Sequence, residues 1–215
     1  LKELVANVLP FGDTIVDLYI KGGWAMHIEL IVSVVAVAVI IWKFFVLSLA
    51  KKNTKKIVQK IINTAREEGV DAAVELCEKT SGPIAAIMYA GLRKQGKNIE
   101  EIEKSIENAA SIEMAFLEKG LVILTTCSTV APLTGFLGTV SGMIRAFDSI
   151  AAAGEVSPTL VASGISEALI TTAAGLVVAI PIHIFHNLFI ALIDGMIVDM
   201  EDSSLVLMEY LAETA

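Results

Sequence analysis

Long runs of apolar residues dominate this sequence, with no sustained alternation of apolar and polar positions. Residues 121–144 contain no charged side chain, and residues 168–193 contain no Asp, Glu, Lys or Arg. A further run, residues 28–49, is interrupted by only two charged residues, Glu29 and Lys43. About 20 apolar residues in a helix cross the hydrocarbon core of a bilayer, which is about 30 Å thick. Each run therefore predicts one transmembrane helix.

The segments between these runs are polar and read as helices separated by turns. Residues 51–119 are rich in Ala, Glu, Lys and Ile, and isolated glycines mark the turns between the expected helices. No strong breaker separates residues 99–117 from the second run, so one long helix is expected to leave the membrane there. The sequence predicts an all-α membrane protein with three transmembrane helices, the second and third of which extend into a helical cytoplasmic domain.

The pattern divides the chain into seven predicted segments. They are a periplasmic or interfacial amphipathic segment at 1–22, transmembrane helix 1 at 23–50, a cytoplasmic helical domain at 51–119, transmembrane helix 2 at 120–147, a periplasmic loop at 148–157, transmembrane helix 3 at 158–193 and a cytoplasmic C-terminal helix at 194–215.

The flanks of the first run indicate its orientation. Trp24 and Trp42 lie near its two ends, where indoles prefer the lipid–water boundary. Lys43 is expected to snorkel toward the headgroups. Residues 51–119 carry 12 of the 16 Lys and Arg residues, and positive charge near span ends stays on the cytoplasmic side. The N-terminus is therefore expected in the periplasm and, with three spans, the C-terminus in the cytoplasm.

Composition narrows the class of function. The chain has 215 residues, of which 55% are hydrophobic and 19% are charged, whereas a soluble domain is about a quarter charged. A formal net charge of −8 argues against nucleic acid as a partner, because such proteins need basic surface. No nucleotide loop, catalytic triad or metal-ligand cluster is present in the sequence. His183 and His186 lack a third ligand nearby, so neither an enzyme nor a metal site is predicted.

Glu167 is the one carboxylate at membrane depth in the predicted third span. Such a group costs at least ~2.5 kcal/mol on insertion scales, so it is expected to face a partner, a cavity or the bundle interior. At about 100° per residue, Ser163 and Thr171 share its face of the helix, as do Gly164 and Ala174. This stripe could line a polar path for protons. Alternatively, Glu167 bonds across helices and only holds an assembly together.

The second span carries residues for close packing. Gly138 and Gly142 form a small-xxx-small pair, which lets helices approach closely in lipid. Pro132 removes a backbone donor, and Pro181 repeats this feature in the third span. Thr139 could offer its hydroxyl to a lumen or bond back to its own helix. Arg145 and Asp148, three residues apart, are expected to form a local ion pair.

Two long motifs resemble those of the MotA/TolQ/ExbB proton-channel family. They are APLTGFLGTVSG at residues 131–142 and GISEALITTAAGL at residues 164–176, the latter followed by AIP at 179–181 and by Asn187. The segment GGW at residues 22–24 is similar to the one that precedes the first span in the ExbB/TolQ branch. The resemblance covers essentially the whole chain and is greatest to the ExbB/TolQ branch.

The resemblance implies a homo-pentameric ring around a pore that holds the spans of a small single-span subunit of the ExbD/TolR type. By motif position, Glu167 corresponds to the family's pore glutamate, and Thr139 and Thr172 to its pore threonines. Helical geometry favours Thr171 on the face of Glu167 instead, and Thr172 is preferred here on the motif. The residues expected to pack helices are Gly135, Gly138, Gly142, Gly164, Gly175, Pro132 and Pro181.

The function implied is that of a proton-channel or stator subunit of a motor in the bacterial inner membrane. It would couple proton-motive force to transport or work at the outer membrane, through a periplasm-spanning protein of the TonB/TolA type. No cofactor is expected apart from protons as the transported ion and a bound phospholipid from the bilayer. Two alternatives remain open: a flagellar-type stator subunit, which would have four spans, and a membrane scaffold without an ion path.

Overall fold

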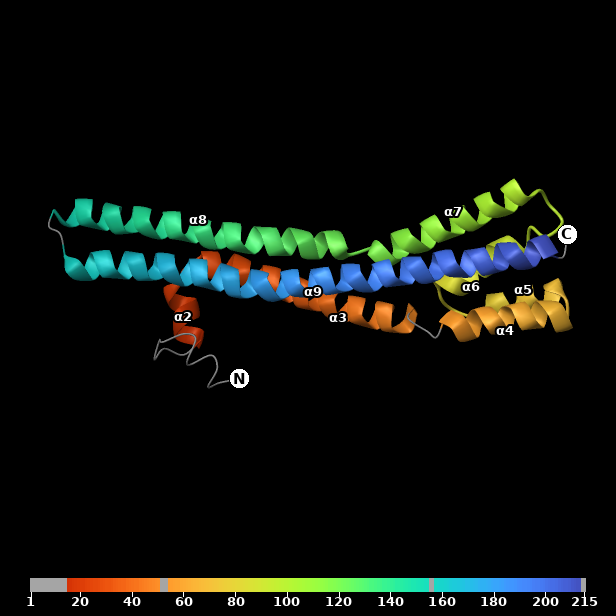
Figure 1. Ribbon diagram of the computed structural model, residues 1–215. Helices are drawn as coiled ribbons and strands as arrows, with labels where there is room; N and C mark the ends of the chain where they lie inside the picture. Colours follow the sequence, from red (N-terminus) through yellow and green to blue (C-terminus); the bar gives the residue numbers. More distant parts are fainter. Residues whose placement is uncertain (1–14, 51–53, 155–156, 214–215) are drawn as a thin grey trace. The chain divides into compact units, whose positions relative to one another are not determined.

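The computed structural model describes residues 15–50, 54–154 and 157–213, and every element in those ranges is an α-helix (Figure 1). Within them, three helices are long and apolar enough to cross a membrane: α3 (Ala25–Ala50), α8 (Leu121–Ala153) and α9 (Pro158–Glu213). The prediction of an all-α chain with three candidate spans is confirmed. The other described helices are α2 (Ile15–Lys21), α4 (Thr54–Glu67), α5 (Val70–Lys79), α6 (Pro83–Leu92) and α7 (Ile99–Glu118).

Helices α8 and α9 extend beyond the segments predicted for them. Helix α8 continues to Ala153, through residues that were expected to belong to the loop at 148–157. Helix α9 begins at Pro158, whose fixed φ suits a first helical turn, and runs to Glu213 without interruption. The third span was predicted to extend beyond residue 193, and residues 158–213 form one helix as that prediction requires. Residues 1–14 of the predicted amphipathic segment and residues 155–156 of the predicted loop lie outside the described residues.

The chain breaks between α7 and α8, where one continuous helix was expected. Gly120 has a φ of +93°, a conformation that side chains disfavour. The ring of Trp42 packs on this glycine so closely that a Cβ there would lie 2.7 Å from the indole. The expectation of a continuous helix was wrong. The sequence around Gly120 does not show that the indole of Trp42, which is distant in the sequence, packs against this glycine where the helix ends.

The buried side chain of Lys43 binds the carbonyl groups at the end of α7, next to this break. Its side chain is 0% exposed, and its ammonium group donates hydrogen bonds to the carbonyl oxygens of Leu117 and Lys119, the latter at 3.0 Å. The last carbonyls of a helix have no partner in their own helix and carry the negative end of its dipole. The expected snorkelling of Lys43 to the headgroups was therefore wrong, because the end of α7 offers it acceptors within the fold.

Replacing Lys43 with methionine is expected to destabilise the protein by about 3 kcal/mol, since two carbonyl groups would lose charge-assisted hydrogen bonds in a buried place. The melting temperature in detergent should fall clearly. The control is Lys60→Met, because Lys60 is exposed on α4. An equal melting temperature for the two variants would show that Lys43 does not hold the α7–α8 junction.

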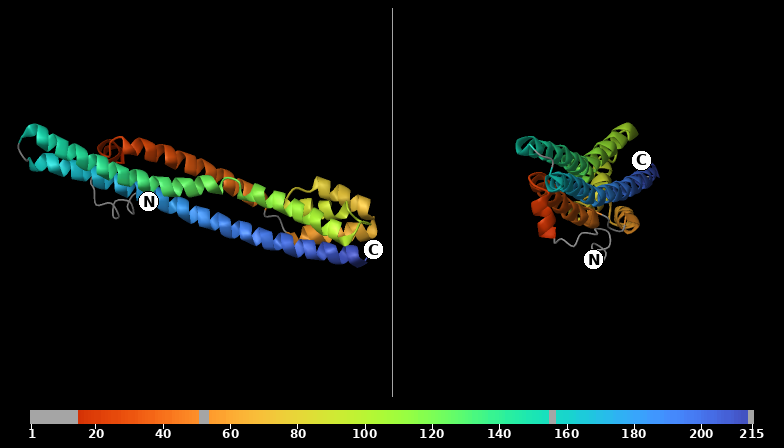
Figure 2. Two further views of the ribbon diagram at one scale, coloured as in Figure 1. Left: turned by 90° about the horizontal axis from the view of Figure 1, so that it is seen from above. Right: turned by 90° about the vertical axis from the view of Figure 1, so that its left-hand side faces the viewer.

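Contacts between residues divide the chain into two compact units. The first comprises the described part of residues 1–39 together with Ile123–Phe185, and so contains α2, most of α3, most of α8 and the first half of α9. Helices α8 and α9 run antiparallel and side by side from the connection that joins them (Figures 1 and 2). This unit contains the residues that were predicted to line an ion path.

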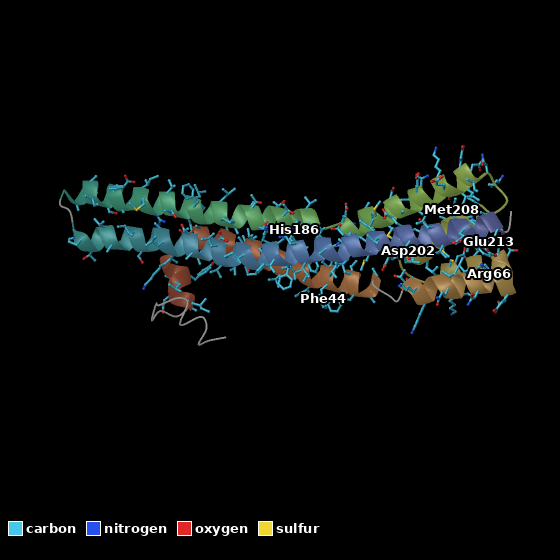
Figure 3. The ribbon with its side chains drawn as sticks, viewed as in Figure 1. Phe44, Arg66, His186, Asp202, Met208 and Glu213 are labelled. Atoms are coloured by element: carbon cyan, nitrogen blue, oxygen red, sulfur yellow. The ribbon has the colours of Figure 1, made fainter. Side chains whose placement is uncertain are left out.

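The second unit comprises Ile40–Val122 and residues 186–215. Helix α6 lies at its centre and buries most of its side chains. Its Gly91 packs on Leu207 of α9 and on Ile106 of α7, so closely that a Cβ there would lie 2.5 Å from the leucine. At the far end of α4, Arg66 pairs with Glu213 of α9 at 3.2 Å (Figure 3).

Candidate functional site

Helices α8 and α9 meet along a seam of small residues, where backbone touches backbone. A Cβ placed on Gly135 would lie 2.7 Å from the carbonyl oxygen of Thr171, and one placed on Gly175 would lie 2.7 Å from that of Ala131. Small residues permit this approach, which supplies van der Waals contact in a membrane where apolar surfaces gain little from meeting each other.

The other glycines that were predicted to pack helices also lie in this seam. Gly138 contacts the side chain of Thr171, Gly142 faces the backbone of Ala168, and Gly164 contacts Ala146. Pro132 and Pro181 lie inside helices that continue through them, so their role in packing stays a prediction.

Gly135→Ala is expected to destabilise the protein by about 1–3 kcal/mol, because the added methyl would push against the backbone of α9. The melting temperature of the purified protein should fall accordingly. Gly195→Ala is a matched control, since Gly195 is helical and has open space around its Cβ position. Alanine favours a helix over glycine by about 1 kcal/mol, so the control should melt at the same temperature or higher. A control as unstable as Gly135→Ala would contradict the seam.

Glu167 forms an ion pair with Arg145 across the seam. The Nη2 atom of Arg145 donates to Oε1 of Glu167, whose side chain is 17% exposed while that of Arg145 is 52% exposed. The expected local pair between Arg145 and Asp148 was wrong, because the antiparallel helices bring Glu167 to the height of Arg145. The carboxylate thus has a positive partner inside its own chain.

The turn between α2 and α3 closes over this ion pair. Gly23 has a φ of +66°, and a Cβ there would lie 2.5 Å from Oε1 of Glu167 and 3.3 Å from Nη2 of Arg145. The next residue, Trp24, donates from its indole nitrogen to the hydroxyl of Ser141 on α8 at 3.0 Å. A glycine is needed at position 23 both for its backbone conformation and for the space that the carboxylate occupies.

A polar pocket of about 410 Å³ adjoins the ion pair. Besides Arg145 and Glu167, it is lined by Lys21 and by three serines, Ser149, Ser163 and Ser166. Ser163 lies in this wall beside Glu167, and its place in a polar path stays a prediction. The pocket provides hydroxyl and charged groups, which are able to hold water or exchange protons.

Further along the seam, two threonines meet face to face. The hydroxyls of Thr139 and Thr172 are hydrogen-bonded to each other, and both reach the carbonyl oxygen of Ala168, at 3.0 and 3.2 Å. Thr139 also bonds back to Gly135 of its own helix at 3.3 Å, which is one of the two roles that its sequence allowed. The structure therefore joins the two threonines that the family motif pairs.

Thr171 shares the Ala168 carbonyl with this pair but is turned toward Gly138. Its side chain is 0% exposed, its hydroxyl donates to the carbonyl of Ala168 at 2.9 Å, and it packs on Gly138. Helical geometry correctly placed Thr171 on the face of Glu167, but that face turns into the seam. Of the two neighbouring threonines, Thr172 is the one whose hydroxyl lies beside Thr139.

Sequence reasoning missed two residues of this site. Arg145 was read as a local partner, although it lies 8 residues before the end of α8 at Ala153 and Glu167 lies 9 residues after the start of α9 at Pro158. Nearly equal spacing from the facing helix ends predicts nearly equal height in an antiparallel pair, and this signal would have found the ion pair. The position of Gly23 over the carboxylate depends on the path of α3 and had no such signal.

Comparison with known proteins identifies the family. The model of the MotA/TolQ/ExbB proton channel family matches residues 79–202, more than half of the chain. An ExbB-like biopolymer transport protein of Synechocystis sp. is 32% identical over 159 residues, which cover 73% of this chain and 76% of that protein. The biopolymer transport protein ExbB of Xanthomonas campestris is 27% identical, over 78% of this chain and 74% of its own length.

A shorter stretch of this chain is similar to a TolQ protein. The Tol-Pal system protein TolQ of Pseudomonas aeruginosa is 39% identical over 93 residues, which cover 43% of this chain and 40% of that protein. These are proteins of transport and of channels, and the family is not one of enzymes. With its three apolar helices, the chain is a multi-pass membrane protein. It belongs to the MotA/TolQ/ExbB proton channel family and, within that family, to the ExbB/TolQ branch.

Proposed function

We propose that this chain is the channel subunit of a proton-driven motor in the bacterial inner membrane, which performs transport or other work at the outer membrane. The observation that carries the proposal is the order of polar groups along the α8–α9 seam. The ion pair of Arg145 and Glu167 is followed, about one and a half turns further along α9, by the hydroxyl pair of Thr139 and Thr172. These groups lie in otherwise apolar helices of a proton channel family.

The energetics suit such a motor. A charge that moves through 100 mV of membrane potential releases about 2.3 kcal/mol. A hydroxyl pair can pass a proton by exchanging which oxygen donates, and Glu167 can accept one when Arg145 moves away. Each proton that passes could therefore drive one step of a helix set that turns inside a ring.

The proposed ring consists of five copies around a small single-span partner of the ExbD/TolR type. Large apolar side chains lie exposed on all three spanning helices, among them Val34 at 61%, Leu137 at 52% and Val177 at 60%. Exposed apolar surface on this scale requires lipid or other protein. We assign these faces to lipid, including a bound phospholipid, to neighbouring copies and to the partner.

The orientation proposed is the one that the basic residues favour. Lys55, Lys56 and Lys60 of α4 follow the first span, and such positive charge favours α4–α7 in the cytoplasm and the N-terminus in the periplasm. The end of α8 and the start of α9 then lie on the periplasmic side, about two helical turns from the ion pair. A periplasm-spanning protein of the TonB/TolA type would receive the force there.

Native mass spectrometry tests the assembly. The full chain is to be co-expressed with the small single-span protein encoded beside it, extracted in mild detergent and sprayed intact. Five copies with fewer copies of the partner would agree with the proposal. A monomer or a dimer without partner, reproduced across mild detergents, would contradict it.

One observation favours a second candidate, a membrane scaffold without an ion path. The ion pair of Arg145 and Glu167 holds α8 to α9, and this is what a purely structural carboxylate would do. The two functions differ in the result expected when Arg145 and Glu167 exchange their positions. A scaffold needs only opposite charges at these two positions, whereas a channel needs the carboxylate where Glu167 lies.

A further inference from the structure

Glu29 is a buried carboxyl group that the proposed path does not use. It lies in the second turn of α3 and is 2% exposed. Within the part of the chain that the structure describes, neither of its carboxyl oxygens has a hydrogen-bond partner. Lys43, the other buried charged residue of α3, has two carbonyl acceptors. Glu29 is thus a polar group whose contacts do not account for its burial.

The carboxyl group of Glu29 lies next to Gly175 of α9, at the seam between α8 and α9. A Cβ on Gly175 would lie 3.3 Å from Oε1 of Glu29 and 2.7 Å from the carbonyl oxygen of Ala131. The absence of a side chain at Gly175 therefore leaves a small niche. A carboxyl oxygen from α3 and a backbone carbonyl from α8 border that niche together.

Among the described residues, the helix segments that border this niche carry no Lys or Arg. The apolar runs 121–144 of α8 and 168–193 of α9 contain no Lys, Arg, Asp or Glu. On α3, His27 bonds to Tyr19 at 2.8 Å, and Arg145 is paired with Glu167. An ionised carboxylate without a positive partner or donors is very costly in an apolar interior. A neutral acid is far less costly, and its O–H can donate to an oxygen such as that of Ala131, which has a second lone pair.

We infer that Glu29 is a proton-binding site, in which the niche formed by Gly175 and the Ala131 carbonyl holds its carboxyl group as the neutral acid at neutral pH. The bound ligand is a proton, taken up from water when the chain folds into the membrane. Gly175 follows Thr172 by three residues on α9, so the site lies about one turn from the threonine pair. This inference does not depend on conduction through Glu167.

Infrared difference spectroscopy of the full chain in lipid tests the inference directly. The spectrum of the wild type minus that of Glu29→Gln at neutral pH should show the C=O stretch of one protonated carboxylic acid. The matched control is Glu201→Gln, because Glu201 is exposed on α9 and should contribute only a carboxylate band. No acid band in the first difference, or an equal band in both, would overturn the assignment.

A second variant keeps the test decisive if Glu29→Gln folds poorly. Glu29→Leu replaces a neutral acid by an apolar side chain of similar size, and it should melt within a few degrees of the wild type. A collapse of both neutral variants, seen as loss of the folded band in size-exclusion chromatography, would show that the fold needs a charged Glu29. Neither readout measures proton flux, so failure here leaves the proposed channel function standing, and failure of that function leaves this site standing.

Discussion

Glu167→Gln is expected to reduce proton flux through the reconstituted complex to about one hundredth of the wild-type value, while the ring still assembles. Glutamine keeps the shape of the side chain and can accept a hydrogen bond from Arg145, but it cannot take up and release a proton at neutral pH. The loss of a charged partner in such a site is worth about 3 kcal/mol, which corresponds to about two powers of ten in rate. Flux is measured as acidification inside vesicles under an imposed membrane potential.

The exchanged pair Arg145→Glu with Glu167→Arg separates a conducting carboxylate from a structural one. It keeps opposite charges across the seam and should restore the melting temperature that either single change lowers. If Glu167 serves conduction, the exchanged pair stays inactive. Full flux in the exchanged pair, or in Glu167→Gln itself, would show that Glu167 only fastens α8 to α9.

Thr139→Val and Thr172→Val should each lower the flux about tenfold or more. Valine has nearly the shape of threonine, so the loss falls on the hydroxyl pair that connects α8 to α9. Removing one hydroxyl breaks the hydrogen bond within the pair, although the other hydroxyl keeps the Ala168 carbonyl as an acceptor. A lost hydrogen bond is worth up to about 1.5 kcal/mol, and each 1.4 kcal/mol is a factor of ten in rate. The double variant should be little worse than either single one, because the two hydroxyls act as a pair.

Thr134→Val is the matched control for this prediction. Thr134 is also a buried threonine of α8, 7% exposed, but its hydroxyl donates only to the Val130 carbonyl of its own helix, at 2.9 Å. Its flux should stay within about twofold of the wild type, since one local hydrogen bond is worth only about 1 kcal/mol of stability. If all three valine variants lost flux equally, the hydroxyl pair would have no special role.

The candidate spans were predictable because crossing a membrane requires a continuous run of about 20 apolar residues, which can be read directly from the sequence. A run such as residues 121–144 must be helical in lipid whatever packs against it. The break at Gly120 and the burial of Lys43 were not predictable in this way. Each depends on the other, since Lys43 turns inward to carbonyls that exist as acceptors only because α7 ends there.

The candidate site was predictable as far as it lies on α8 and α9. Thr139 lies 14 residues before the end of α8 and Thr172 lies 14 residues after the start of α9, so a tight antiparallel pair brings them together. The contribution of α3 was hidden, because nothing in the sequence tells which residues of α8 and α9 it meets. Gly23 over the carboxylate and Glu29 in the seam are both of this kind.

The most direct test of the proposed channel measures proton flux into vesicles that contain this chain together with its small single-span partner. We expect flux that follows the imposed potential, requires both proteins and falls to about one hundredth when Glu167→Gln replaces the wild type. Vesicles as tight to protons with the complex as without it, at a verified protein content and orientation, would contradict a proton channel.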